Sequence, residues 1–533
     1  MSPRLPDGEQ QVVGEGHRDT SLWANRRVFA VTLYLGVSLF EYGFDKGAIA
    51  GFQAMPGFLQ VFGYQTESGE WDIHAGPQQI ISSFMILGSV IGSMLTGFTG
   101  TYLGRRYSLM LGSLVVIVCT VIMSETTSLG ALYFSRLLIG VGNGMLLNFT
   151  VLYLQECTPA YFRGLCLSMV TCWITIGTTI GMVINHQTND IMSRKAYQIP
   201  LYVCYPAPVI LILTLPFFPE SPRWLLHHGK PDDALRSLRF FRKGAYDEVA
   251  VQQEFEEMKA VARREMETRT NWRLFFELFR GHHLRRTIIA VGVGTANAGV
   301  GAMFILAFGT YFFEVANVGD PFKWIIVTNC IGLAGLFLTW TVVTYVGRRR
   351  IILAGCAICT LPMLIMAAVY TAPDVPEGGA GIALVILVSV YVFGFNFGLE
   401  PYVYLVAGEI PAQNLRGYTM GLSTAVSFTF AWLTAFTTPY FINRAELNWG
   451  PKYGYIWFGA GLIVTLFVWY YLPEVRGRSL EEIDEMFRNK VPTRDFPKYV
   501  CVESEEAKER GIMNVRRDEK AEAAHVEVAQ RDE

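Results

Sequence analysis

Long apolar stretches recur along almost the whole of this sequence, and they constrain its fold more than any other feature. Each contains about 20 residues, which is the length that an α-helix needs to cross roughly 30 Å of hydrocarbon. Inside a bilayer, backbone hydrogen bonds are satisfied only by helices or closed barrels. The sequence therefore predicts an all-α membrane protein with twelve transmembrane helices. The predicted spans cover residues 28–50, 79–100, 107–124, 131–155, 164–185, 200–218, 287–313, 323–346, 350–370, 381–407, 418–441 and 454–472.

Composition excludes several other classes of protein. The chain is 51% hydrophobic and only 17% charged, whereas soluble domains carry about 25% charged residues. A net charge of −2 gives no basic field, so no nucleic-acid partner is expected. The sequence contains no phosphate-binding loop, dinucleotide fingerprint or hydrolase motif, and most of its nine cysteines lie inside apolar stretches. We therefore expect neither an enzyme nor a bound cofactor or metal.

The apolar stretches divide the chain into two six-helix halves. Residues 28–218 form the predicted N-terminal half and residues 287–472 the predicted C-terminal half. A charged, helical linker at 219–286 joins them, after a polar N-terminal tail at 1–27. The tail at 473–533 is polar and is expected to be partly disordered near its end.

Basic residues fall mostly in the connections on one side of the predicted spans. Examples are Arg26, Arg27 and the run Arg348 to Arg350, whereas residues 51–78 on the other side contain no Lys or Arg. By the positive-inside rule the basic side is cytoplasmic. Both termini and the linker are therefore expected in the cytoplasm.

Three landmarks occur once in each half and in the same order. The stretch TYLGRR at 101–106 returns as TYVGRR at 344–349. A Glu-to-Arg spacing at 156–163 returns at 409–416, and Pro-Glu at 219–220 returns at 473–474. Repeats of this kind are typical of transporters whose halves surround a central site.

At these motifs the sequence resembles the sugar porter family of the major facilitator superfamily, from about residue 28 to about residue 487. The segment PESPRWLL at 219–226 matches a family signature after the sixth span, and PEVRGRSLEE at 473–482 resembles the signature after the twelfth. The stretch at 51–58 resembles fungal members. The resemblance implies the major facilitator fold, alternating access and a plasma-membrane location.

The repeated turns TYLGRR and TYVGRR predict a cytoplasmic gate, in which their arginines contact helix ends and carboxylates. The alternative is that each arginine only sets topology. Thr101 and Thr344 replace acidic residues of the family pattern, and threonine cannot form their ion pair. The predicted gate residues are Gly104, Arg105, Arg106, Glu156, Arg163, Glu220, Arg223, Gly347, Arg348, Arg349, Glu409, Arg416, Glu474 and Arg478.

Asp45 lies within the first predicted span, where a charge facing lipid costs about 2.5–3.5 kcal/mol. Arg136, early in the fourth span, matches the arginine that pairs with this aspartate in proton-coupled sugar porters. The resemblance implies that protonating Asp45 weakens the pair and that deprotonation restores it, which couples transport to one proton. A static structural ion pair is the alternative.

The substrate site is less defined by the sequence. The amide and indole positions of the family fall on Asn297, Ala298, Met303, Leu399 and a position near Cys172, so most of them do not match. Glu400 stands in the tenth span beside Pro401 and either binds a polar or cationic substrate group or pairs with an internal donor such as Lys46. The substrate-binding candidates are Glu41, Asn297, Tyr311, Asn329, Asn396, Glu400 and Trp432.

The sequence therefore predicts a secondary active transporter that takes up a sugar or related small polar molecule together with a proton. An exporter or importer of a non-sugar metabolite is the main alternative, and a non-transporting nutrient sensor is a further one. The expected partners are the substrate, the proton and the lipid bilayer, and the sequence leaves the oligomeric state open.

Overall fold

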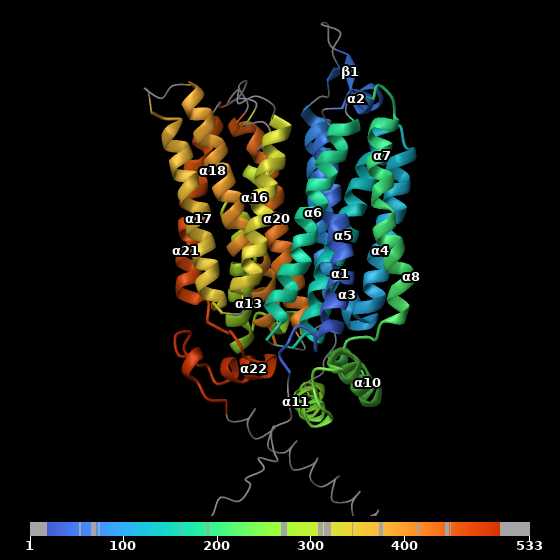
Figure 1. The fold of residues 1–533 in the computed structure, drawn as a ribbon, viewed down its shortest axis with the longest axis vertical. Helices are drawn as coiled ribbons and strands as arrows, with labels where there is room; N and C mark the ends of the chain where they lie inside the picture. The colour runs from blue at the N-terminus through green and yellow to red at the C-terminus, as the bar shows by residue number, and fades with distance from the viewer. Residues whose placement is uncertain are drawn as a thin grey trace, which may run out of the picture.

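The structure is a computed structural model that describes residues 19–501, apart from 53–54, 66–70, 73–74, 160, 189–190, 268–273, 307–312, 314–320, 344, 373–376, 413–414, 443–446 and 448. The described chain is mainly helical, as the sequence predicts. Two bundles of long helices stand side by side, and shorter helices lie beyond one end of them (Figure 1). We call that end the linker side.

Eleven helices in the described part of the chain are long and apolar enough to cross a membrane. The seventh predicted span is interrupted: it consists of α13 and α14, followed by helical residues 302–306. The remainder of that span, apart from Phe313, lies outside the described residues. The first half contains α1 (Arg26–Phe52), α3 (Ala75–Tyr102), α4 (Gly104–Glu125), α5 (Leu129–Cys157), α6 (Arg163–Thr188), α7 (Lys195–Cys204), α8 (Pro206–Thr214) and η1 (Leu215–Phe217). The second contains α13 (Gly281–Gly294), α14 (Ala296–Gly299), α16 (Pro321–Val342), α17 (Arg348–Val369), α18 (Glu377–Gly398), α19 (Glu400–Glu409), α20 (Arg416–Ile442), η2 (Gly450–Tyr453) and α21 (Gly454–Tyr471).

Two of the predicted spans are divided at prolines. The sixth divides into α7 and α8 at Pro206, and the tenth divides into α18 and α19 just before Pro401. Proline lacks the backbone N–H that would continue a helix. The second break places Glu400 at the first position of α19, inside the membrane-spanning part of the chain.

Helices within each half pack closely. In the first half α1 packs on α6, and α3 and α4 both pack on α5. A Cβ atom on Gly140 of α5 would lie 3.0 Å from the Cα atom of Gly88 of α3, so the two backbones touch. Small residues at such crossings are typical of membrane helix pairs.

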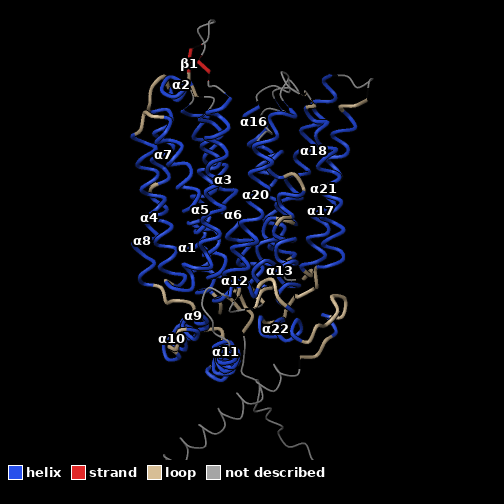
Figure 2. Tube along the Cα trace, turned by 180° about the vertical axis from the view of Figure 1, so that it is seen from behind, coloured by secondary structure: helices blue, strands red, loops and turns tan. Residues whose placement is uncertain are grey.

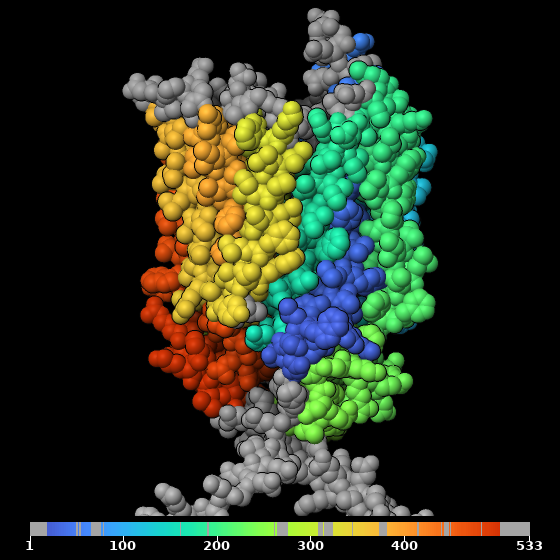
Figure 3. Space-filling model, in the orientation of Figure 1, coloured from blue at the N-terminus to red at the C-terminus, as the bar shows by residue number. Residues whose placement is uncertain are grey.

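The two halves meet through related pairs of helices. The second span, α3, packs on the eleventh, α20, and the eighth, α16, packs on the fifth, α6. These pairs correspond under exchange of the halves, in keeping with the sequence repeat. The halves lie next to each other in the views from both sides (Figures 1 and 2), and their surfaces meet along a long boundary (Figure 3).

The outer faces of the bundles are apolar. Phe217 is 84% exposed and Ile463 is 70% exposed. Many large apolar side chains on an outer face favour contact with lipid over contact with water. This exposure agrees with the predicted membrane environment.

The linker side carries a smaller layer of helices: α9 (Pro222–His227), α10 (Pro231–Arg242), α11 (Glu248–Glu267), α12 (Leu274–Glu277) and α22 (Leu480–Arg488). Leu225, Leu238 and Phe255 form part of a separate apolar core among α9, α10 and α11. Arg286 of α13 forms an ion pair of 2.6 Å with Asp484, which ties α22 to the second half. On the opposite side lie α2 (Pro56–Phe62) and the short hairpin of β1 (Tyr64–Gln65) and β2 (Trp71–Asp72).

Candidate transport site and gate

The predicted coupling residues form a buried ion pair. Arg136 Nη1 of α5 donates to Asp45 Oδ1 of α1 at 2.8 Å and to Oδ2 at 3.1 Å. The two side chains are 0% and 2% exposed, respectively. Arg136 Nε also donates to the carbonyl of Ile81 in α3 at 3.3 Å. The guanidinium therefore links three helices of the first half, and the low-dielectric surroundings make its interaction with Asp45 strong and its loss costly.

Glu41 lies one helical turn before Asp45 and is 1% exposed. It is within electrostatic range of both Asp45 and Arg136, so it belongs to the same cluster inside the first half. Neither carboxylate oxygen of Glu41 has a hydrogen-bond partner among the described residues. The structure thus places this predicted substrate-binding residue beside the coupling pair.

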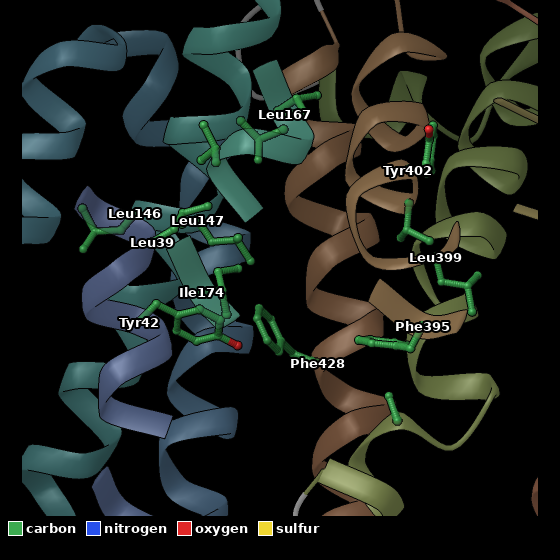
Figure 4. Packing of buried hydrophobic residues seen from close by; sticks show 14 of the residues in the cluster. Leu39, Tyr42, Leu146, Leu147, Leu167, Ile174, Phe395, Leu399, Tyr402 and Phe428 are labelled. Carbon is green, nitrogen blue, oxygen red and sulfur yellow. The ribbon is translucent and has the colours of Figure 1, made fainter. Parts of the chain in front are cut away.

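Lys46 and Glu400 come from opposite halves and interact electrostatically. Both side chains retain partial exposure, unlike Asp45. The Lys46 ammonium lies 5.4 Å from the centre of the Tyr42 ring, and the Tyr42 hydroxyl is directed toward the second half (Figure 4). Lys46 is therefore an internal cation within electrostatic range of Glu400, and both roles that the sequence left open for Glu400 remain predictions.

The remaining substrate candidates fall into different surroundings. Asn297 hydrogen-bonds Tyr404 through its side chain, and its Oδ1 has no partner within the described chain. Asn329 donates to Met182 Sδ at 3.4 Å, and Asn396 accepts from Thr175 at 3.2 Å. Those two asparagines therefore join the second half to α6.

Two further candidates complete the set. Trp432 stacks on Phe436 of its own helix at 5.6 Å. Tyr311 lies outside the described residues. Asn297 and Glu400 are both partly exposed and stay predicted substrate-binding residues.

The predicted gate of the first half is an extended network around two glutamates. Arg105 binds Glu156 through two bonds of 2.9 and 2.7 Å. Glu220 accepts the backbone N–H groups of Arg105 and Arg106 at 3.1 and 3.0 Å. This carboxylate therefore caps the beginning of α4, where the helix dipole favours negative charge. Burial raises the pKa of Glu220, and these backbone donors oppose the effect.

The second half repeats the cap. Glu474 accepts the backbone N–H groups of Arg348 and Arg349 at 2.9 and 3.2 Å. The two turns differ in backbone conformation, because Gly104 has φ +85° whereas Gly347 has φ −69°. Only Gly104 therefore adopts the left-handed conformation that favours glycine. A Cβ atom at Gly347 would instead overlap the Glu474 carboxylate.

Ion pairs cross between the halves on the linker side. Arg163 of α6 lies 3.3 Å from Glu409 of α19, and Arg348 reaches the other oxygen of Glu409 at 3.7 Å. Arg416 of α20 interacts electrostatically with Glu156 of α5. This pair corresponds to Arg163 and Glu409 when the two halves are exchanged. The repeated Glu-to-Arg spacing thus provides two interactions between halves.

Gln155 adds a contact between the halves that the sequence analysis missed. Its amide donates to the carbonyls of Tyr404 and Leu405 at 3.1 and 3.3 Å. The sequence signal for this contact was a glutamine next to Glu156 in an apolar span. The direction of its side chain depends on how the halves meet, so the contact could not be predicted.

Four further residues of the predicted gate or its sequence pattern are Arg478, Arg223, Thr101 and Thr344. Arg478 lies 3.8 Å from Glu482 and donates to the Tyr499 carbonyl at 2.7 Å, so it stabilises the α22 region and contacts no gate carboxylate. Arg223 is buried in α9, within electrostatic range of Cys157. Thr101 donates to the Gly97 carbonyl of its own helix at 2.7 Å, and Thr344 lies outside the described residues.

Replacing Gly104 with alanine is expected to lower the thermal stability of the detergent-solubilised protein. An L side chain in this left-handed conformation costs about 1–2 kcal/mol, and its Cβ atom would lie 2.7 Å from Glu220 Oε2. Gly130→Ala is the matched control, because a Cβ atom there meets nothing within 4 Å. Equal melting temperatures for Gly104→Ala and the control would contradict this account of the turn.

The arrangement of helices and buried charges defines a polytopic membrane transporter with the major facilitator fold. A crystal structure of the major facilitator superfamily proton:xylose symporter XylE, bound to 6-bromo-6-deoxy-D-glucose, superposes with a TM-score of 0.74 at 20% identity. The match covers 87% of this chain and 99% of XylE.

The family model described as "Sugar (and other) transporter" matches residues 30–487, and the chain belongs to that family. One relative is the major facilitator-type transporter ecdD of Aspergillus rugulosus, which is 26% identical, with 86% of this chain and 87% of the relative covered. Another is the hexose transporter HXT10 of Saccharomyces cerevisiae, also 26% identical, with 87% and 86% covered. The protein is a multi-pass membrane transporter and not an enzyme.

Proposed function

We propose that the protein imports a sugar or a related small polar molecule together with a proton by alternating access. The observation that carries this proposal is the ion pair of Asp45 and Arg136, buried completely inside one half. A carboxylate in such a place is costly unless paired, so its protonation has a large effect on the surrounding helices. The relatives include a hexose transporter and a proton:xylose symporter, which supports both the substrate class and the coupling ion.

Protonation of Asp45 would remove its negative charge and weaken its attraction for Arg136. The helices α1 and α5 would then lose their strongest link, which changes the relative free energies of the two access states. Release of the proton would restore the pair. One proton would accompany each cycle.

The contacts of the linker-side gate would break and re-form as the transporter changes between its two access states. Arg163 and Glu409 join the halves and support a state that is closed on the linker side. Rocking of the halves about the central site would break these contacts and open that side. We propose that the linker side is cytoplasmic, because the basic connections lie on that side. The family resemblance supports the further proposal that the protein works in the plasma membrane.

A charged, non-sugar substrate is the second candidate, and Lys46 with Glu400 is the observation that favours it. These two partly exposed charges come from opposite halves and interact electrostatically. A substrate with a carboxylate or an amine could replace one member of the pair. A sugar would instead rely on neutral donors and acceptors such as Asn297 and Tyr404.

Competition for uptake in yeast that lacks its own hexose transporters tests the proposed substrate class. Labelled glucose should enter cells that express the protein, and an uncoupler should remove most of this uptake. Inhibition of this uptake by an excess of xylose, maltose, a dicarboxylic acid or an amine then shows which class of substrate the protein prefers. Correctly localised protein that takes up no glucose but an organic acid or amine would establish the second candidate instead.

A further inference from the structure

Glu41 is the buried charge that the proposed coupling mechanism does not use. Both of its oxygens lack a partner among the described residues, and its side chain is 1% exposed. An ionised carboxylate in this position would cost several kcal/mol. Within the described chain, Arg136 Nη2 is likewise buried without a partner, although Nη1 is fully used by Asp45. One guanidinium therefore stands beside two carboxyl groups while it pairs with only one of them.

We propose that Glu41 and Asp45 hold one transported proton between them, with Arg136 as their shared counter-ion. This inference rests on the proposed proton coupling and extends it by a second proton-holding residue. The loaded cluster is neutral, with the proton on one carboxyl and Arg136 paired to the other. On Glu41 the proton leaves Asp45 paired with Arg136, as in the described state. On Asp45 the proton weakens that pair and leaves Arg136 to Glu41.

Release of the proton breaks the O–H bond of the protonated carboxyl, and the proton passes to water. Both carboxylates are then ionised, and Arg136 can offer Nη1 to Asp45 and Nη2 to Glu41. The cluster has a net charge of −1 in this unloaded state. Binding a proton to a negative cluster is easier than binding one to a neutral pair, so Glu41 raises the proton affinity of the site.

Few other ionisable groups influence this cluster. Those within electrostatic range of Glu41 in the described chain are Asp45 and Tyr42 of α1, Arg136 of α5, Cys119 of α4 and Cys204 of α7. Neither cysteine nor the tyrosine provides a positive charge. Arg136 is the only cation in this set, so the two carboxyl groups compete for it.

Glu41→Gln is expected to move the pH of half-maximal uptake downward by about one unit or more, because the neutral amide removes one negative charge from the site. Glu41→Asp keeps a titratable group and should restore much of the wild-type profile. Glu125→Gln, the same change at an exposed position, should have no effect. A Glu41→Gln profile that coincides with the wild-type profile would mean that Glu41 is a permanently neutral packing residue, which overturns the proposal.

Infrared difference spectroscopy of purified protein tests the same inference without any substrate. The difference spectrum of wild type minus Glu41→Gln should show the carbonyl stretch of a protonated carboxylic acid. This signal should convert to a carboxylate signal as the pH rises. A signal that is carboxylate at every pH, or that never titrates, contradicts the proposal. Because no sugar is needed, failure of the proposed substrate and failure of the shared proton site give different results.

Discussion

Replacing Asp45 with asparagine is expected to abolish uphill accumulation of substrate while leaving exchange of substrate across the membrane. Asparagine has nearly the shape of a protonated aspartate but cannot release a proton, so the helices remain in the loaded condition. With one proton per substrate, a pH difference of one unit supports about tenfold accumulation in the wild type. The variant should only equalise the internal and external concentrations.

Accumulation and counterflow exchange in proteoliposomes measure the two properties separately. Asp233→Asn is the matched control, since Asp233 forms an exposed ion pair with Arg236 that contributes little. Full accumulation by Asp45→Asn would remove Asp45 from the coupling mechanism. Loss of both activities from a well-folded variant would favour the static structural pair.

Replacing Glu409 with glutamine is expected to open the linker side of the transporter. Glu409 is 1% exposed and faces Arg163 and Arg348, so the neutral amide leaves two buried arginines without their carboxylate. Breaking a buried ion pair costs about 3–5 kcal/mol. Only the pair with Arg163 joins the two halves, so the cost of losing that pair falls on the linker-closed state. It corresponds to roughly a hundredfold or greater shift in the equilibrium between closed and open states.

Spin labels on the linker-side ends of the two halves report this opening. Tyr107 and Tyr345 are 52% and 75% exposed and can carry the labels after substitution with cysteine, in a background in which the exposed Cys330 is replaced. Glu409→Gln should lengthen the distance between the labels in most molecules. Glu248→Gln, at an exposed ion pair of the linker, should leave it unchanged. A distance distribution in Glu409→Gln that matches the wild type would contradict the gate.

Much of the fold could be predicted because its main determinant is local. A bilayer requires apolar helices of fixed length, so spans such as α4 and α17 appear directly in the sequence. The repeated motifs likewise indicated two related halves. The interruption of the seventh span at Thr295 was not predicted, because the residues around the break are mostly small and include no proline that would mark it.

The candidate site was predicted less completely, because the direction of a side chain depends on how helices pack. The partnership of Asp45 and Arg136 followed from a family pattern, and the structure brings the two together. Asn329 and Asn396 are polar residues in apolar spans, and only the packing against α6 shows that they have protein partners. The same packing places Glu41 beside the ion pair.

Proton movement in proteoliposomes is the most direct test of the central claim that substrate and proton cross the membrane together. Wild-type protein should acidify the vesicle interior when a transported sugar is added outside, with no pH gradient imposed, and Asp45→Asn should not. Sugar entry through wild-type protein without any accompanying change in internal pH would contradict the account and would make the protein a uniporter.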